Sequence, residues 1–169
     1  VDELVILDIM ATKNKREPDY KFIKEIVSEA FMPIGYGGGV SELEHIRKLF
    51  QLGVDKVIIN SAAILEPDLI KKASEIYGNQ SIIVSLDVKK DMWGQYKLYS
   101  HPNNKKIKLD LFQFIKKIES LGAGEIIVNS VDNDGVMNGY DTNLIESVSK
   151  IVQVPVIALG GAGSVKDLK

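Results

Sequence analysis

Glycine-rich segments follow three short apolar runs in this sequence of 169 residues. Gly35–Gly39 comes after Met32–Ile34, Asp134–Gly135 comes after Ile126–Asn129, and Gly160–Gly163 comes after Pro155–Ile157. In a parallel α/β protein, loops of this kind hold bare backbone N–H groups close to helix N-termini, which favours the binding of anions. The pattern predicts a phosphorylated ligand, with the alternative that glycine only permits tight turns between strands and helices.

Asp87 is the candidate for acid–base chemistry, because it ends the apolar run Ser81–Asp87. Catalytic side chains of barrel enzymes gather at the carboxyl ends of the strands, where a carboxylate can exchange protons with a bound substrate. An aspartate at a strand end can also initiate a turn or cap a helix. The residue by itself leaves both roles open.

Three charged residues, Glu3, Lys56 and Glu125, open apolar runs. Each lies an even number of residues before the ligand end of its run, so its side chain shares a face with the residue at that end. If that face points into a barrel, the three charges form a ring at its base, where opposite charges offset part of the desolvation cost. The alternative is that residues at strand starts are exposed to solvent.

Short β-branched runs alternate with stretches of helical periodicity along the whole chain. The runs are almost continuously apolar, as is typical of strands that are buried on both faces of a parallel sheet. The expected strands are Glu3–Asp8, Met32–Tyr36, Lys56–Asn60, Ser81–Asp87, Glu125–Val131 and Val154–Leu159. Apolar stripes within 22–27, 43–50, 69–76, 111–118 and 144–148 predict helices between them. Ser41 and Glu44 predict a capping box at the second helix.

One connection, Lys89–Lys108, is longer than the others. Within it, Gln95–Tyr99 alternates polar and apolar residues next to Trp93 and Gly94, which predicts a small hairpin. We therefore expect 91–108 to be a hairpin or loop inserted above the sheet, within a single domain that spans 1–169.

An internal repeat favours a barrel of the duplicated half-barrel type. Tyr36–Ser41 and Leu159–Ser164 have similar sequences, and each follows a strand that ends in aspartate, Asp8 or Asp132. A complete (β/α)8 barrel has about 250 residues. We therefore expect a partial barrel of about six strands that lacks the first βα unit and the last strand. An open parallel sheet is the competing architecture, but its apolar edges would be unprotected.

The composition argues against several classes of protein. A formal net charge of -2, with 21 basic and 23 acidic residues interspersed, provides no basic surface for nucleic acid and no polybasic membrane anchor. No apolar run approaches the roughly 20 residues of a membrane span, so we expect a cytoplasmic protein. Cysteine is absent, and two histidines, His45 and His101, cannot form a histidine-rich metal site. We expect no metal or other cofactor, and both histidines at the surface.

Several longer motifs add a resemblance to a known family. They are Asp2–Ile9, Tyr36–Val40, Val57–Ala63, Val84–Lys89, Gly122–Ile127, Asp132–Gly135 and Gly139–Asp141. Together they resemble the cyclase subunit of imidazole glycerol phosphate synthase and its relatives, nearly from end to end. The resemblance implies a (β/α)8-barrel lyase of histidine biosynthesis that takes ammonia from a glutaminase subunit in a heterodimer. Its implied reaction converts a bisphosphorylated ribosyl-carboxamide precursor into imidazole glycerol phosphate and aminoimidazole carboxamide ribotide.

The same resemblance implies roles for individual residues. Asp87 becomes the general acid/base. One phosphate pocket is formed by Gly38, Gly39, Asn60 and Ser61, and a second by Asp134, Gly135, Gly160 and Gly161. Glu3, Lys56 and Glu125 become the gate through which ammonia enters. The family's second catalytic aspartate belongs on a first strand outside these residues, so the 169 residues alone are expected to be inactive.

Two other functions stay open within the resemblance. Near relatives pair with a glutaminase to supply ammonia for the amidination of a sugar in surface polysaccharide or flagellar glycan synthesis. Three features of the sequence favour this branch: Tyr36 before the triple glycine, Met10 after the Asp8 strand, and the sequence of the insert at 101–107. A scaffold that only conducts ammonia, with Asp87 retained for ligand binding, is the other alternative.

Overall fold

The structure is a computed structural model that describes residues 2–101 and 105–168, so residues 102–104 of the expected insert lie outside the described residues. Two compact units are present. The first comprises Val1–Val84 and Leu121–Gly124, and the second comprises Ser85–Ser120 and Glu125–Lys169. Strand β4 (Ile82–Lys90) passes from the first unit into the second.

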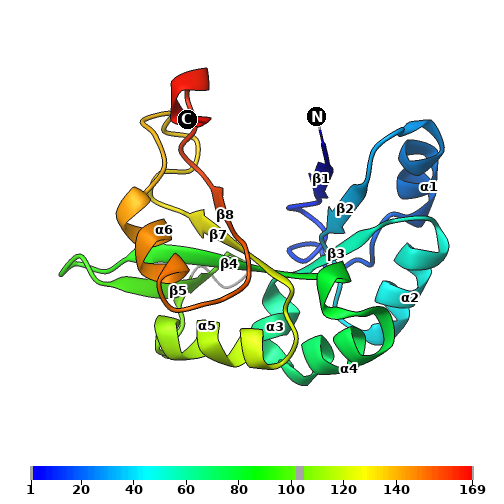
Figure 1. Cartoon of the computed structure of the whole chain (residues 1–169), viewed down its shortest axis with the longest axis horizontal. Coiled ribbons are helices and arrows are strands. Elements are labelled where there is room, and N and C mark those ends of the chain that lie inside the picture. Colours follow the sequence, from blue (N-terminus) through cyan, green and yellow to red (C-terminus); the bar gives the residue numbers. More distant parts are fainter. Residues whose placement is uncertain (1, 102–104, 169) are drawn as a thin grey trace. The chain divides into compact units, whose positions relative to one another are not determined.

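The first unit alternates strands with helices. In chain order it contains β1 (Leu4–Leu7), α1 (Tyr20–Glu29), β2 (Ile34–Gly37), α2 (Leu43–Gln51), β3 (Lys56–Ile59), α3 (Ser61–Leu65), α4 (Asp68–Tyr77), the 3-10 turn η1 (Asn79–Ser81) and the start of β4. Strands β1, β2, β3 and β4 pair in parallel in this order. Figure 1 shows α1, α2 and α4 along the same face of β1–β3. The short helix α3 was not expected from the sequence.

The strands of this unit have two chemically different faces. Ile34, Tyr36 and Val57 are almost completely buried on one face, as the apolar runs predict. Gly35 belongs to the other face, where a β-carbon at its position would lie 3.2 Å from Ile58 Cδ1 and 3.7 Å from Glu3 Oε1. Side chains alternate along a strand, so Lys56 is on the same face as Ile58.

The second unit combines parallel and antiparallel pairing. After the end of β4 it contains β5 (Tyr96–Ser100), β6 (Lys105–Lys106), α5 (Leu111–Ser120), β7 (Glu125–Ser130), α6 (Thr142–Ser149), β8 (Val156–Leu159) and the 3-10 turn η2 (Val165–Leu168). Strand β7 pairs in parallel with β8 and also pairs with β4. The sequence predicted that the fourth strand ends at Asp87, but β4 continues to Lys90 because Val88–Lys90 pairs antiparallel with β5.

Aspartates cap helices α1 and α6, whereas the capping box expected at the second helix is wrong. Asp19 accepts a hydrogen bond from the Phe22 N–H, and Asp141 accepts one from the Leu144 N–H, each at 3.1 Å. Helix α2 has Glu42 at its N-cap, without a side-chain hydrogen bond. The Ser41 N–H instead donates to His45 Nδ1 at 3.3 Å.

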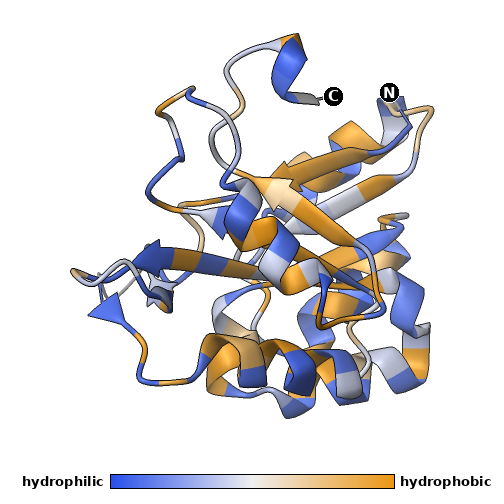
Figure 2. Ribbon diagram, turned by 60° about the vertical axis from the view of Figure 1, so that its left-hand side comes forward, coloured by the Kyte–Doolittle hydropathy of each residue, from blue (hydrophilic) through white to orange (hydrophobic). Residues whose placement is uncertain are grey.

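The order of elements is that of an α/β protein, a partial (β/α)8 barrel, as predicted. Within the described ranges, β1–β4, β7 and β8 are the parallel strands, and helices separate them along the chain. Figure 2 shows hydrophobic and hydrophilic residues alternating along the helices, which is typical of helices that cover a sheet. None of the helices in residues 2–101 and 105–168 has the length and hydrophobicity needed to cross a bilayer.

Candidate functional site

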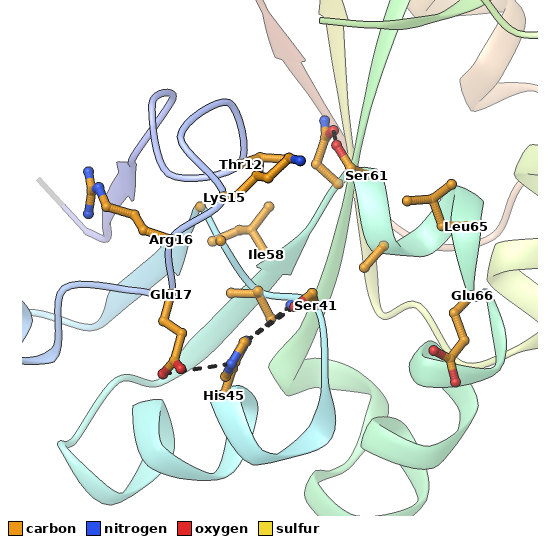
Figure 3. A pocket seen from close by; sticks show the side chains of 15 residues that line it. Thr12, Lys15, Arg16, Glu17, Ser41, His45, Ile58, Ser61, Leu65 and Glu66 are labelled. Atoms are coloured by element: carbon orange, nitrogen blue, oxygen red, sulfur yellow. Dashed lines mark hydrogen bonds and ion pairs between the residues drawn. The ribbon is translucent and has the colours of Figure 1, made fainter. Parts of the chain in front are cut away.

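A cavity of about 450 Å³ lies in the first unit, beyond the carboxyl ends of β1, β2 and β3 (Figure 3). It brings together the glycine loop and the polar residues that the sequence predicted for one phosphate pocket: Gly38, Gly39, Asn60 and Ser61. The loop after β1 contributes Thr12, Lys15, Arg16 and Glu17. The cavity therefore combines backbone, hydroxyl, amide and cationic groups.

The two central glycines are required by the packing of neighbouring loops. Gly38 has a φ of +123°, and a β-carbon there would lie 2.5 Å from the Asp8 carbonyl oxygen. Gly39 has a φ of +70°, and a β-carbon there would lie 2.5 Å from the Arg16 carbonyl oxygen. Both positions exclude a side chain because the loop after β1 lies against them. Packing against the loop after β1 therefore explains why these two positions are glycine, independently of any ligand in the cavity.

Asp8 organises the loop after β1. Its carboxylate accepts hydrogen bonds from the backbone N–H groups of Met10 and Ala11, each at 3.1 Å, and from Arg16 Nη2 at 2.7 Å. Figure 3 shows the Arg16 side chain pointing away from the cavity and the Lys15 side chain extending into it. Lys15 was not predicted from the sequence, and its φ of 51° is rare for a non-glycine residue.

His45 is buried, which corrects the expectation that it lies at the surface. Only 5% of the residue is exposed, and it lines the cavity. Because Nδ1 accepts the Ser41 N–H, the proton of the neutral ring lies on Nε2, which is 3.1 Å from Glu42 Oε1 and 3.8 Å from Glu17 Oε2. The imidazole therefore connects the start of α2 to the loop after β1 (Figure 3).

Tyr36 belongs to a different environment from the cavity. Only 1% of the residue is exposed, and it is not among the residues that line the cavity. Burial, with a smaller contribution from the negative charge of Asp8, raises the pKa of the Tyr36 hydroxyl to about 12. Tyr36, the residue before the triple glycine that favoured the sugar-amidination branch, therefore lies in the packed core of the first unit.

Glu3 and Lys56 form an ion pair on the strand face that carries Gly35. Lys56 Nζ lies 2.8 Å from Glu3 Oε2, and the two side chains are 22% and 29% exposed, respectively. The pair joins β1 to β3 across β2, where Gly35 has no side chain to separate them. Glu125, the third charge expected with them, opens β7 in the second unit and is half-buried.

Asp87 is held near the end of β4 by neighbours within the second unit. The residue is 8% exposed, and its Oδ1 accepts a hydrogen bond from Asn129 Nδ2 at 2.8 Å. His101 Nε2 lies 3.7 Å from the same oxygen. Asp87 was predicted at a ligand-facing strand end, but neither of these partners was predicted. Asn129 could have been found, because it stands near the end of β7 as Asn60 stands after β3.

The loops predicted to form the second glycine pocket lie beside Asn129. A β-carbon at Gly160 would lie 2.8 Å from Asn129 Oδ1 and 3.4 Å from the Asp134 Cα. The Gly161 carbonyl accepts a hydrogen bond from the Gly139 N–H at 2.8 Å, which joins the loop after β8 to the loop after β7. Gly135 has a φ of +74° and open space around its β-carbon position.

A polar network fixes the start of α6 to the hairpin of β4 and β5. Asp141 accepts a hydrogen bond from Tyr96 Oη at 2.8 Å and pairs with Lys90 Nζ at 2.9 Å. Burial by itself raises the pKa of Asp141, but hydrogen bonds from Lys90, Tyr96 and the Leu144 N–H outweigh it and lower the pKa below its usual value. The same pair raises the pKa of Lys90.

Comparison with known proteins identifies the family. Residues 1–169 match the family described as histidine biosynthesis protein. The chain belongs to this family. It is 45% identical, over 99% of its length, to imidazole glycerol phosphate synthase subunit HisF of Petrotoga mobilis, of which it covers 67%. It is equally 45% identical over 99% of its length to a Pseudomonas aeruginosa protein provisionally named imidazole glycerol phosphate synthase subunit hisF2, of which it also covers 67%.

Identity to the HisF subunit of Prochlorococcus marinus AS9601 is 41% over 99% of the chain and 66% of that protein. The resemblance to the cyclase subunit of imidazole glycerol phosphate synthase is therefore confirmed at the level of the family. The chain spans about two thirds of the length of the curated HisF relatives that it matches.

Proposed function

We propose that this member of the histidine biosynthesis family acts as the ammonia-dependent cyclase subunit of an imidazole glycerol phosphate synthase. The observation that carries the proposal is the environment of Asp87. A carboxylate near a strand's carboxyl end, 8% exposed and oriented by Asn129 at 2.8 Å, suits a general acid/base in a chain that is 45% identical to a HisF subunit.

The proposed reaction joins ammonia to a bisphosphorylated ribosyl-carboxamide precursor. Ammonia adds to the precursor, one water molecule leaves, and ring closure yields imidazole glycerol phosphate. The bond to the departing aminoimidazole nitrogen breaks, and that nitrogen must gain a proton to leave as aminoimidazole carboxamide ribotide. We assign this proton transfer to Asp87, whose fixed carboxylate does not need to reorganise during the reaction.

We propose that the glycine loops of the two units each receive one phosphate. In the first unit, one cavity is lined by Gly38, Gly39, Asn60, Ser61 and Lys15. It therefore offers backbone and side-chain hydrogen-bond donors together with the positive charge of a lysine. In the second unit, Asp134, Gly135, Gly160 and Gly161 would form the other subsite, with the 134–135 and 160–161 loops packed beside Asn129. Backbone N–H groups can bind phosphate in a protein whose formal net charge is -2.

Glu3, Lys56 and Glu125 are proposed as the entrance for ammonia from a glutaminase subunit. The Glu3–Lys56 pair supports this role, because a half-buried ion pair can separate and re-form without unfolding the strands that carry it. Gly35 lets the pair approach across β2, because a β-carbon at this position would lie 3.2 Å from Ile58 Cδ1 and 3.7 Å from Glu3 Oε1. We propose that the partner binds at this end of the strands and delivers ammonia here.

A steady-state assay of the full-length protein tests the proposal. The protein would be given the bisphosphorylated precursor and an ammonium salt, and loss of precursor absorbance would be followed. We expect turnover by the wild type and a loss of roughly 10²- to 10⁴-fold in Asp87→Asn, the range typical of a general acid/base. Asp68→Asn, an exposed aspartate in the first turn of α4, is the matched control and should keep wild-type turnover.

A second candidate function is ammonia delivery for the amidination of a sugar. Two relatives from one Vibrio vulnificus strain, 46% and 44% identical to this chain, are provisionally named subunits hisF2 and hisF3, which is consistent with more than one such protein per organism. Met10, 43% exposed after β1, remains a difference that favours this branch. Binding of the precursor without turnover, in a wild type that still accepts ammonia from its glutaminase, would favour this candidate over the cyclase.

A further inference from the structure

A histidine lies beside the carboxylate that we propose as the acid/base. His101 Nε2 is 3.7 Å from Asp87 Oδ1, and the same oxygen accepts a hydrogen bond from Asn129 Nδ2 at 2.8 Å. The distance to His101 is slightly longer than a hydrogen bond. Catalytic contacts are often long in the absence of substrate and shorten in the reacting complex, so the separation is compatible with proton transfer.

The two side chains differ in their access to water. The Asp87 side chain is 11% exposed, whereas the His101 side chain is 53% exposed. A proton on Asp87 therefore exchanges with bulk water less readily than a proton on His101. Imidazole has two ring nitrogens and changes its charge near neutral pH, so it can accept a proton on one side and release one on the other.

Tyr99 restricts the orientation of the His101 ring. The two rings are perpendicular, with an interplanar angle of 87° and centroids 5.0 Å apart, which is a favourable edge-to-face arrangement. Tyr99 itself is 9% exposed and belongs to β5, which pairs with β4 directly after Asp87. The exposed imidazole thus directly follows β5, with Nε2 on the Asp87 side.

We propose that His101 relays protons between Asp87 and solvent. The inference rests on the proposed cyclase function, in which Asp87 gives a proton to the departing amine nitrogen as its bond to carbon breaks. As His101 transfers its Nε2 proton to Asp87 Oδ1, its Nδ1 accepts a proton from solvent, so the ring stays neutral, and exchange with solvent then restores the proton to Nε2. The same steps run in reverse when Asp87 removes a proton from the substrate, so no oxidant or further reactant is required.

Turnover of the full-length protein with ammonium chloride and the precursor tests the relay. In His101→Ala we expect kcat to fall roughly 10- to 100-fold, the lower part of the range for acid–base groups, with KM changed less than about twofold. Added imidazole should restore much of the lost kcat in His101→Ala, but none in Asp87→Asn. Met92→Ala, 84% exposed at the tip of the same hairpin, is the matched control and should behave as the wild type.

The possible results separate the relay from the cyclase function. An active wild type whose kcat is unchanged in His101→Ala overturns the relay and leaves the cyclase function standing. A lower kcat that imidazole does not restore also overturns it, because such a loss would be structural. His101→Asn, with thermal unfolding measured for both variants, removes the proton carrier while keeping a polar side chain. A wild type without turnover overturns the cyclase function and the relay together.

Discussion

Replacing Gly39 with alanine tests whether close packing of the two loops shapes the cavity. Gly39 has a φ of +70°, and a β-carbon would lie 2.5 Å from the Arg16 carbonyl oxygen. Gly94, at the hairpin tip, has a nearly equal φ of +78° and no atom within 4 Å of its β-carbon position. Comparing Gly39→Ala with Gly94→Ala therefore separates the free-energy cost of steric overlap from the cost of placing alanine in the left-handed backbone region.

The expected decrease in the free energy of unfolding follows from these two costs. Alanine in the left-handed region costs about 1–2 kcal/mol, which applies to both variants. Overpacking against a backbone atom adds about 1–3 kcal/mol, which applies only to Gly39→Ala. We therefore expect the free energy of unfolding to decrease by about 1–2 kcal/mol in Gly94→Ala and by about 2–5 kcal/mol in Gly39→Ala.

Urea unfolding of the two full-length variants measures the difference, and steady-state kinetics measures its consequence. Gly39→Ala should also raise KM for the bisphosphorylated precursor, because the Arg16 backbone and the glycine loop must separate at the cavity. Gly94→Ala should leave KM unchanged. Equal destabilisation of the two variants would refute the packing argument, and a normal KM in Gly39→Ala would remove this cavity from the substrate site.

The remaining predictions concern two ion pairs. Lys56→Met leaves Glu3 half-buried without this partner and should lower the free energy of unfolding by about 1–2 kcal/mol, between the values for exposed and buried pairs. In the complex with the glutaminase, it should also lower glutamine-supported turnover relative to ammonium-supported turnover, and an unchanged ratio would contradict the gate. Because the folded-state pKa of Asp141 is lowered, its stabilising contribution is present above the ordinary aspartate pKa of about 3.9 and is lost as the pH falls through the lowered value. Asp141→Asn should therefore flatten the acid side of the stability curve, whereas Glu146→Gln, which removes an exposed pair, should leave it nearly unchanged. Equal acid profiles for the wild type and Asp141→Asn would show that the network does not set the acid stability.

The strands and most helices could be predicted because burial imposes its pattern directly on the sequence. Val57 and Ile59 lie in a run that is apolar at nearly every position, and such a run has few alternatives to a buried strand. The end of β4 could not be predicted in this way. Val88–Lys90 continues the strand only because β5 folds back onto it, and this pairing depends on residues further along the chain.

The glycines of the candidate site could be predicted, because glycine is the residue that tolerates a positive φ and a close backbone neighbour. Gly38 and Gly39 stand out in the sequence, and the structure gives each a positive φ and a close neighbour. The burial of His45 could not be predicted, because its position outside the apolar stripe of the helix does not indicate that it accepts a hydrogen bond from the Ser41 N–H. The proximity of His101 to Asp87 also depends on the path of the hairpin and could not be found from spacing.

The central claim is that Asp87 contacts the reacting atoms of a bisphosphorylated substrate. A crystal structure of full-length Asp87→Asn with the bound precursor tests it most directly, because the substitution keeps the shape of the side chain and slows turnover. The account predicts the precursor's reacting nitrogen within hydrogen-bond distance of the side chain at position 87, one phosphate in the cavity lined by Gly39 and Ser61, and the other at the Gly160–Gly161 loop. A precursor bound with its reacting atoms away from position 87 would contradict the claim.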